Sequence, residues 1–140
     1  MRKLFFLALS LVAVYTAGAQ YTFTCTSIDL VNKSSQAVTE HNEVRQIYNI
    51  SLKDRVLVHN VFEDGVEGVS DSQVYQITEV KESGANEIVF YAKSGVSGKL
   101  YEYRLVDAEG AVPALWLKVA DEDYDMRYNG MVSAMKTFQQ

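Results

Sequence analysis

Residues 99–106 read KLYEYRLV, and this segment shows the clearest pattern in the chain. Its residues Tyr101, Tyr103 and Leu105 alternate with charged side chains. Successive side chains of a β-strand point to opposite faces, so a period of two residues indicates a strand with one buried face. The segment therefore predicts a half-buried strand whose inner face carries two tyrosines.

Three further runs of the same kind surround this segment, at residues 73–81, 87–93 and 114–120. In the last of them Leu115 and Leu117 share one face, and Trp116 lies on the other. Short segments that contain glycine separate the first runs, and a longer one with Pro113 precedes the last. Strand-like runs joined by such turns predict an antiparallel meander.

The same alternation extends to both ends of the domain. Residues 21–26, 48–52 and 55–62 predict three more strands, and the acidic residues 63–72 predict an exposed loop. Residues 124–134 favour one long closing strand, with Gly130 as a bulge or a point of close approach. A helix with Met131, Met135 and Phe138 on one face and a hairpin at Asn129-Gly130 are the alternatives.

Residues 34–45 are the only segment that suggests a helix. Ser34 or Ser35 would cap it, and Val38, His41 and Val44 have helical spacing. A loop with one helical turn is the alternative.

Together these patterns predict an all-β fold with little helix. Seven or eight short strands favour a small antiparallel meander that closes, or nearly closes, into a β-barrel, because closure removes exposed strand edges. A β-sandwich is the alternative.

The first residues have the pattern of a secretory signal. Arg2 and Lys3 precede an apolar run, and the small residues Ala17 and Ala19 predict cleavage before Gln20. Removal of residues 1–19 from the 140-residue chain leaves a single domain of 121 residues. Its net charge changes from −5 to −7, because two basic residues leave with the signal. We therefore expect an exported protein, periplasmic or extracellular, and no membrane span, because no segment has the length of a spanning helix.

Composition excludes several classes of protein. A net charge of −5 and a pI near 5.0 argue against a nucleic-acid partner, which would require a basic patch. A single cysteine excludes a disulfide framework within one chain and a zinc cluster of thiolates. Cys25 alternates with aromatic residues, which predicts a buried side chain rather than a reactive thiol.

Motifs that carry chemistry are weak. His41 and His59 have no partner at metal-ligand spacing, and we expect both to be loop or surface side chains. The acidic residues 121–125 and 63–68 have carboxylates that can bind calcium, but their spacing is typical of solvated turns. We expect no metal and no cofactor.

Three segments also resemble a group of short, signal-bearing, all-β exported proteins of Gram-negative bacteria. These segments are AQYTF at residues 19–23, DRVLV at residues 54–58 and QVYQI at residues 73–77. The group has no established activity, so the resemblance implies an exported β-domain and assigns no functional residue.

The expected function is binding without catalysis. A small barrel holds at most one modest ligand, so we expect a small apolar or aromatic molecule in the barrel mouth or a partner protein on the surface. Tyr101, Tyr103 and Trp116 are the candidate contacts, either as core or as rim residues. The alternatives are a hydrolase or a calcium-dependent factor that uses the acidic residues 121–125, and a structural envelope protein.

Overall fold

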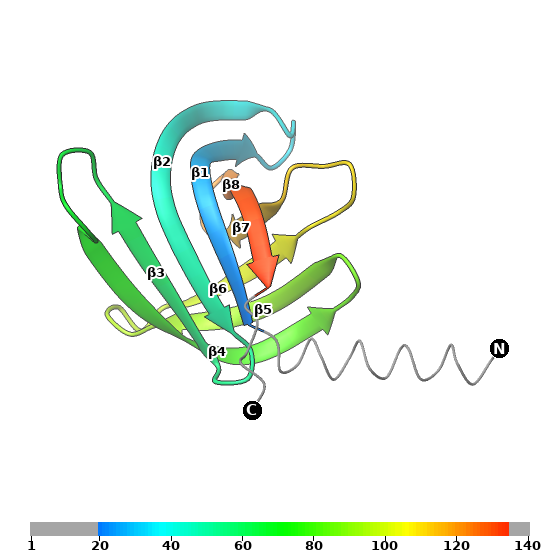
Figure 1. Cartoon of the computed structure of the whole chain (residues 1–140). Coiled ribbons are helices and arrows are strands. Elements are labelled where there is room, and N and C mark those ends of the chain that lie inside the picture. The colour runs from blue at the N-terminus through cyan, green and yellow to red at the C-terminus, as the bar shows by residue number, and fades with distance from the viewer. Residues whose placement is uncertain (1–19, 135–140) are drawn as a thin grey trace, which may run out of the picture.

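The computed structural model describes residues 20–134, which form one closed antiparallel barrel (Figure 1). Each strand pairs with the next along the chain, and the last pairs with the first. The eight strands are β1 (Gln20–Asn32), β2 (Val38–Ser51), β3 (Val56–Phe62), β4 (Asp71–Ser83), β5 (Glu87–Ser94), β6 (Leu100–Val106), β7 (Ala114–Lys118) and β8 (Tyr124–Ala134). The predicted barrel is confirmed, and the sandwich is wrong. The predicted signal at residues 1–19 lies outside the described residues.

The two ends of the barrel differ in what they carry. We call one end the mouth; it holds the connections after β1, β3, β5 and β7, at residues 33–37, 63–70, 95–99 and 119–123. The opposite end, the base, holds the other three connections, the start of β1 and the end of β8. In Figure 1 the hairpin of β3 and β4 leans away from β2 at the mouth.

Closure depends on the long pairing of β1 with β8, which runs from Tyr21 opposite Ala134 to Asn32 opposite Tyr124. A single strand over residues 124–134 is therefore confirmed, while Met135 and Phe138 of the alternative helix lie outside the described residues. Gly130 is the point of close approach, because a Cβ there would lie 1.7 Å from the backbone oxygen of Thr24.

The predicted helix or loop at residues 34–45 is wrong. Turn residues lead into β2, which is extended from Val38 onward and pairs with β1. Residues 38–43 are all exposed, so neither face of this part of β2 is buried. A strand with water on both faces has no reason to alternate apolar and polar residues, which is why its sequence lacks the period of two.

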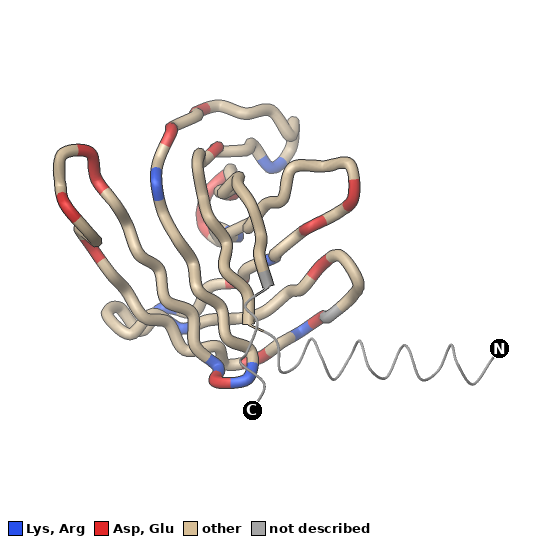
Figure 2. Tube along the Cα trace, in the orientation of Figure 1, with Lys and Arg blue, Asp and Glu red and all other residues tan. Residues whose placement is uncertain are grey.

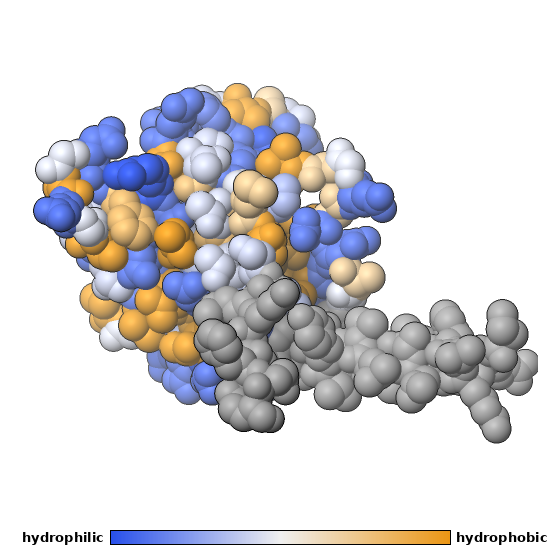
Figure 3. Space-filling model, in the orientation of Figure 1, coloured by the Kyte–Doolittle hydropathy of each residue, from blue (hydrophilic) through white to orange (hydrophobic). Residues whose placement is uncertain are grey.

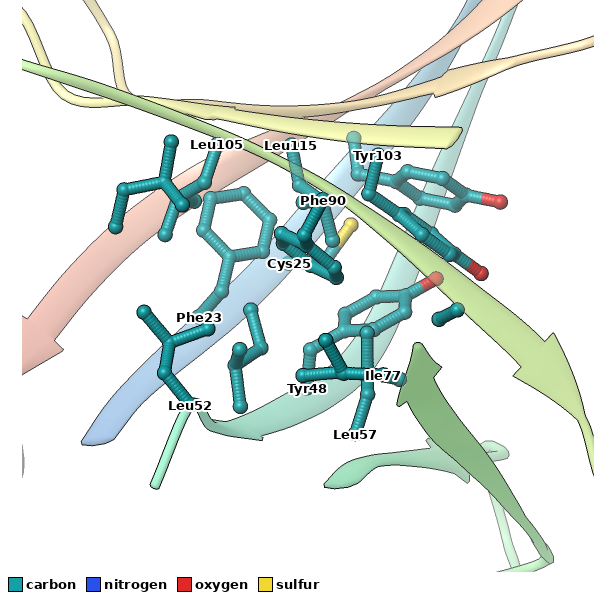
Figure 4. Packing of buried hydrophobic residues seen from close by; sticks show 14 of the residues in the cluster. Phe23, Cys25, Tyr48, Leu52, Leu57, Ile77, Phe90, Tyr103, Leu105 and Leu115 are labelled. Atoms are coloured by element: carbon teal, nitrogen blue, oxygen red, sulfur yellow. The ribbon is translucent and has the colours of Figure 1, made fainter. Parts of the chain in front are cut away.

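The buried core fills the base of the barrel. Figure 4 shows apolar side chains from several strands packed against one another, among them Phe23, Leu52 and Leu115. These side chains are at most 1% exposed. Since the interior of an eight-stranded barrel is just wide enough for side chains to fill, the base is a packed core.

Candidate functional site

The inward-facing side chains are fully buried in the middle of the barrel and partly exposed toward its ends, where Tyr21 and Val132 lie at the base. Phe23, Leu57 and Leu115 are fully buried. The inward-facing residues nearest the mouth are only partly buried: Leu30, Val44, Gln46, His59, Val61, Gln73, Tyr75, Tyr101, Leu117 and Met126. These side chains point into the barrel, and solvent reaches them at its mouth end. The mouth is therefore open, and its lining is accessible.

Tyrosines line the interior between the packed base and the mouth, and three of them point their hydroxyls toward the mouth. The hydroxyl of Tyr48 contacts Gln46, that of Tyr75 donates to Gln73 Oε1 at 2.8 Å, and that of Tyr128 lies 3.8 Å from the sulfur of Met126. Each contacted residue lies two positions nearer the mouth on the same strand. In Figure 4 the hydroxyls of Tyr48 and Tyr103 point to the same side of the core.

The rings of these tyrosines form two groups. Tyr48 stacks on His59 at a centroid distance of 4.1 Å and contacts Tyr128 at 5.3 Å. Tyr75 meets the edges of Tyr101 and Tyr103 at 6.2 and 6.3 Å. Tyr75 belongs to β4 and its partners to β6, so these contacts reach past β5 inside the barrel. Aromatic side chains from β2, β3, β4, β6 and β8 therefore surround the space below the mouth.

The tyrosines and His59 of this lining are uncharged at neutral pH. Burial raises the pKa of Tyr48 and Tyr103 well above the usual range and that of Tyr128 to about 12. Burial also lowers the pKa of His59, although the charge of Asp71 opposes this shift. Protonated tyrosines and a neutral histidine offer hydrogen bonds without net charge.

His59 is held by Gln46. Its Nε2 lies 2.7 Å from Gln46 Oε1, and this nitrogen carries the proton because an amide oxygen only accepts. The expectation of a loop or surface histidine is wrong for His59, which lies partly buried inside the barrel on β3. The same expectation of a surface position is correct for His41, whose side chain is 52% exposed.

A hollow of about 530 Å³ opens beside this lining, between β2 and β3 at the mouth. Val44, Gln46 and Val61 line it from the inner face of the wall, while Arg45 and Phe62 line it from the outer face. The hollow therefore borders both faces of the wall at the mouth end of the β2–β3 pairing, and Thr26 of β1 also lines it. Figure 3 shows the surface indented between the tip of the β3–β4 hairpin and the body of the barrel.

Acidic side chains surround this opening. Glu43, Glu63 and Asp64 line the hollow together with Arg45, which lies 3.9 Å from Asp64. Figure 2 shows further acidic segments at the tip of the same hairpin. The rim is therefore charged and wet, whereas the space behind it is aromatic and neutral.

The structure brings together two of the three candidate residues predicted from the sequence. Tyr103 is buried and stacks on Phe90 at 5.4 Å, and Tyr101 lies nearer the mouth and is partly exposed. Trp116 lies on the outer face of the wall, opposite Leu115 and Leu117, so it takes no part in the mouth.

Sequence reasoning missed four other residues of the mouth. Tyr48, His59, Tyr75 and Gln46 were not among the candidates, although each occupies an inward position in its strand. Strand alternation predicts an inward position for Tyr48, His59 and Tyr75. It does not predict contacts between strands that are not neighbours, which form only in the closed barrel.

Asp29, on the outer face of β1, is the centre of a polar cluster. It is 6% exposed, and it accepts hydrogen bonds from Arg127 Nη2 at 2.8 Å, Asn129 Nδ2 at 2.9 Å and His41 Nδ1 at 2.5 Å. Burial alone would raise the pKa of Asp29, but these hydrogen bonds outweigh it and lower the pKa. The carboxylate therefore stays ionised and ties β1 to β2 and β8.

The other candidates for chemistry lie apart from the mouth lining. Among residues 20–134 no group of three or more His, Cys, Asp or Glu side chains is arranged to hold a metal ion. Residues 121–123 form an exposed turn. Cys25 is buried as predicted, donates to the backbone oxygen of Ser27 at 3.3 Å, and has its pKa raised by burial to about 11.

No protein-family model matches this chain, and neither does any curated protein or any solved structure. Over the described part of the chain, no helix has the length and apolar character required to cross a membrane.

Proposed function

We propose that this protein is a non-enzymatic binding domain that takes a small, uncharged aromatic or apolar molecule at the barrel mouth. The observation that carries this proposal is the partly exposed aromatic lining above the packed core, with Tyr75 and Tyr101 within reach of solvent at the mouth. The hollow of about 530 Å³ beside this lining lies within the range of roughly 300–1,000 Å³ that is usual for small-molecule sites, and Val44, Gln46 and Val61 form its uncharged side.

The chemistry of the lining supports an uncharged ligand. An ionised ligand would lose water without gaining a counter-charge among the tyrosines and the neutral His59, which is unfavourable. A planar ring gains contact with rings such as Tyr75 and Tyr101. Hydroxyl and amide groups near the mouth supply directional hydrogen bonds to polar atoms of the ligand.

Titration with the neutral fluorophore N-phenyl-1-naphthylamine tests this function. We expect its emission to rise to saturation with the wild-type protein. Val61→Trp fills the hollow from its inner side and should weaken binding at least about tenfold. Val74→Trp is the matched control, because Val74 is 52% exposed on the outer face and should leave binding unchanged.

Two results would contradict the proposal. One is an emission change that does not saturate with the wild-type protein. The other is equal affinity for the wild type and the Val61→Trp variant when both melt at similar temperatures.

We also propose that the domain acts outside the cytoplasm, on the basis of the signal pattern in residues 1–19. N-terminal sequencing of protein recovered from the periplasm or medium of a Gram-negative host should begin at Gln20. Protein that retains residues 1–19 and stays in the cytoplasm would argue against export.

A further inference from the structure

A second hollow, separate from the mouth, lies on the outer face of β6, β7 and β8. It measures about 220 Å³, and we call it the Trp116 site. Its lining consists of Glu102, Arg104, Trp116, Lys118 and Asp125. The strand register places these residues side by side, because Arg104 pairs with Trp116 and Glu102 pairs with Lys118.

Trp116 is held in place from the neighbouring strand. The guanidinium carbon of Arg127 lies over its ring, 5.5 Å from the centroid. Arg127 is in turn fixed by Asp29 at 2.8 Å, and Asp29 is buried. A chain of contacts from β1 through β8 to β7 therefore orients an indole that is itself only partly buried.

The formal charges of the lining cancel. Arg104 and Lys118 are positive, and Glu102 and Asp125 are negative. An anionic ligand would face two carboxylates, and a cationic ligand would face two positive side chains. A neutral ligand avoids both penalties.

The lining offers donors and acceptors together. Arginine and lysine only donate hydrogen bonds, and ionised carboxylates only accept them. A hydroxyl group does both, so a ring that carries several hydroxyls can bond to donors and acceptors of the lining, while an apolar molecule would displace their water without replacing its hydrogen bonds. Contacts within the protein hold two of these side chains in place. Arg104 Nε lies 3.3 Å from the carboxylate of Glu87, and Asp125 accepts a hydrogen bond from the backbone N–H of Val119 at 3.0 Å.

We propose that the Trp116 site binds one neutral sugar ring, with an apolar face of the sugar packed against the indole and its hydroxyls bonded to the surrounding charged side chains. A volume of about 220 Å³ is below the usual range of roughly 300–1,000 Å³ for drug-sized ligands, which fits a single ring. The site is open to solvent, so further sugars of a chain can extend from it.

Intrinsic fluorescence reports directly on this site, because Trp116 is the only tryptophan of the chain. The wild-type protein is titrated with a panel of methyl glycosides of neutral hexoses, pentoses and N-acetylhexosamines. We expect at least one sugar to change the emission to saturation in the millimolar range. Sodium acetate and methylammonium chloride at equal concentration should give no saturable change.

Variants locate the binding. Glu102→Ala and Arg104→Ala should each weaken binding of the best sugar at least about fivefold with little change in melting temperature, because Glu102 is partly exposed and the ion pair of Arg104 with Glu87 lies in solvent. Lys53→Ala is the matched control, because Lys53 is exposed at the base and should leave binding unchanged. For Trp116→Phe, saturation-transfer NMR replaces fluorescence, and a weaker sugar signal is expected.

Three results would overturn this proposal. They are no saturable change with any sugar of the panel, a saturable change with acetate or methylammonium, and equal affinity for the wild type and the Arg104→Ala variant. None of them bears on the mouth, which the neutral fluorophore tests separately.

Discussion

Gly130 is the residue on which closure of the barrel depends most visibly. A Cβ at this position would lie 1.7 Å from the oxygen of Thr24 and 3.0 Å from Cα of Cys25, so β8 could no longer pair with β1 in its present register. Gly130→Ala should therefore reduce the free energy of unfolding by about 3 kcal/mol, measured by urea denaturation. Gly84→Ala is the control: its Cβ would meet only an ordinary contact at 3.7 Å, and a change within about 0.5 kcal/mol is expected. Equal stability of the two variants would contradict this role of Gly130.

Asp29 gives the domain an acid-sensitive stability. Its folded-state pKa is lowered from the ordinary value of 3.8, so its stabilising effect is complete above that pH and is lost as the pH falls through the folded-state pKa. At neutral pH, Asp29→Asn should cost about 3 kcal/mol in urea denaturation, because Arg127 loses its buried counter-charge. Below the folded-state pKa the wild type and the variant should converge, and a difference that persists there would contradict this explanation. Asp121→Asn, in the exposed turn, should match the wild type within about 0.5 kcal/mol.

Cys25 should behave as a core residue rather than as a reagent. It is 1% exposed, and burial raises its pKa to about 11, so little thiolate forms in the folded protein at about pH 8. Iodoacetamide should leave the folded protein unmodified by mass spectrometry and should add one group per chain in concentrated urea. Rapid modification of the folded protein would show that the thiol is accessible.

Among the elements, β2 is held unevenly along its length. It pairs with β1 from Val38 to Ser51, but with β3 only from Arg45 onward. Residues 38–44 therefore have a partner on one side only, and their amide hydrogens should exchange at least about tenfold faster than those of residues 46–51. Hydrogen exchange with mass spectrometry measures this difference, and equal protection along β2 would contradict the observed register.

The elements that the sequence predicts well are those with one wet and one dry face. β6 and β8 alternate residue by residue, because one side of each strand contacts the core and the other contacts water. The beginning of β2 was missed, because its backbone pairing with β1 and not side-chain burial makes it a strand. The helical spacing of Val38, His41 and Val44 does not indicate a helix, because these residues do not share a buried face.

At the scale of the whole molecule, closure creates the candidate site. Tyr101 and Tyr103 were identified from one strand alone, but their partner Tyr75 belongs to β4, and Tyr48 and Tyr128 approach each other past β1. Such contacts depend on how far the strands tilt and shift as the barrel closes. Alternation predicts an inner face for each strand, but it does not predict which inner residues meet.

Alternation along β7 separates Trp116 from the two tyrosines with which it was grouped. Trp116 follows Leu115 directly, and a strand sends neighbouring side chains to opposite faces. The same rule was applied in the sequence, where Trp116 was placed opposite the two leucines. Trp116 was a candidate contact as a core or rim residue, and the structure places it on the outer face, apart from Tyr101 and Tyr103.

Binding at the mouth is tested most directly by two-dimensional NMR of ¹⁵N-labelled protein during titration with N-phenyl-1-naphthylamine. We predict shift changes that cluster at Val44, Gln46, His59, Val61 and Tyr101, which line the mouth or its hollow. Signals of the outer-face residues Val74 and Trp116 should stay in place. Shift changes that spread over the outer face, or that avoid the mouth while the probe binds, would contradict a ligand site inside the barrel.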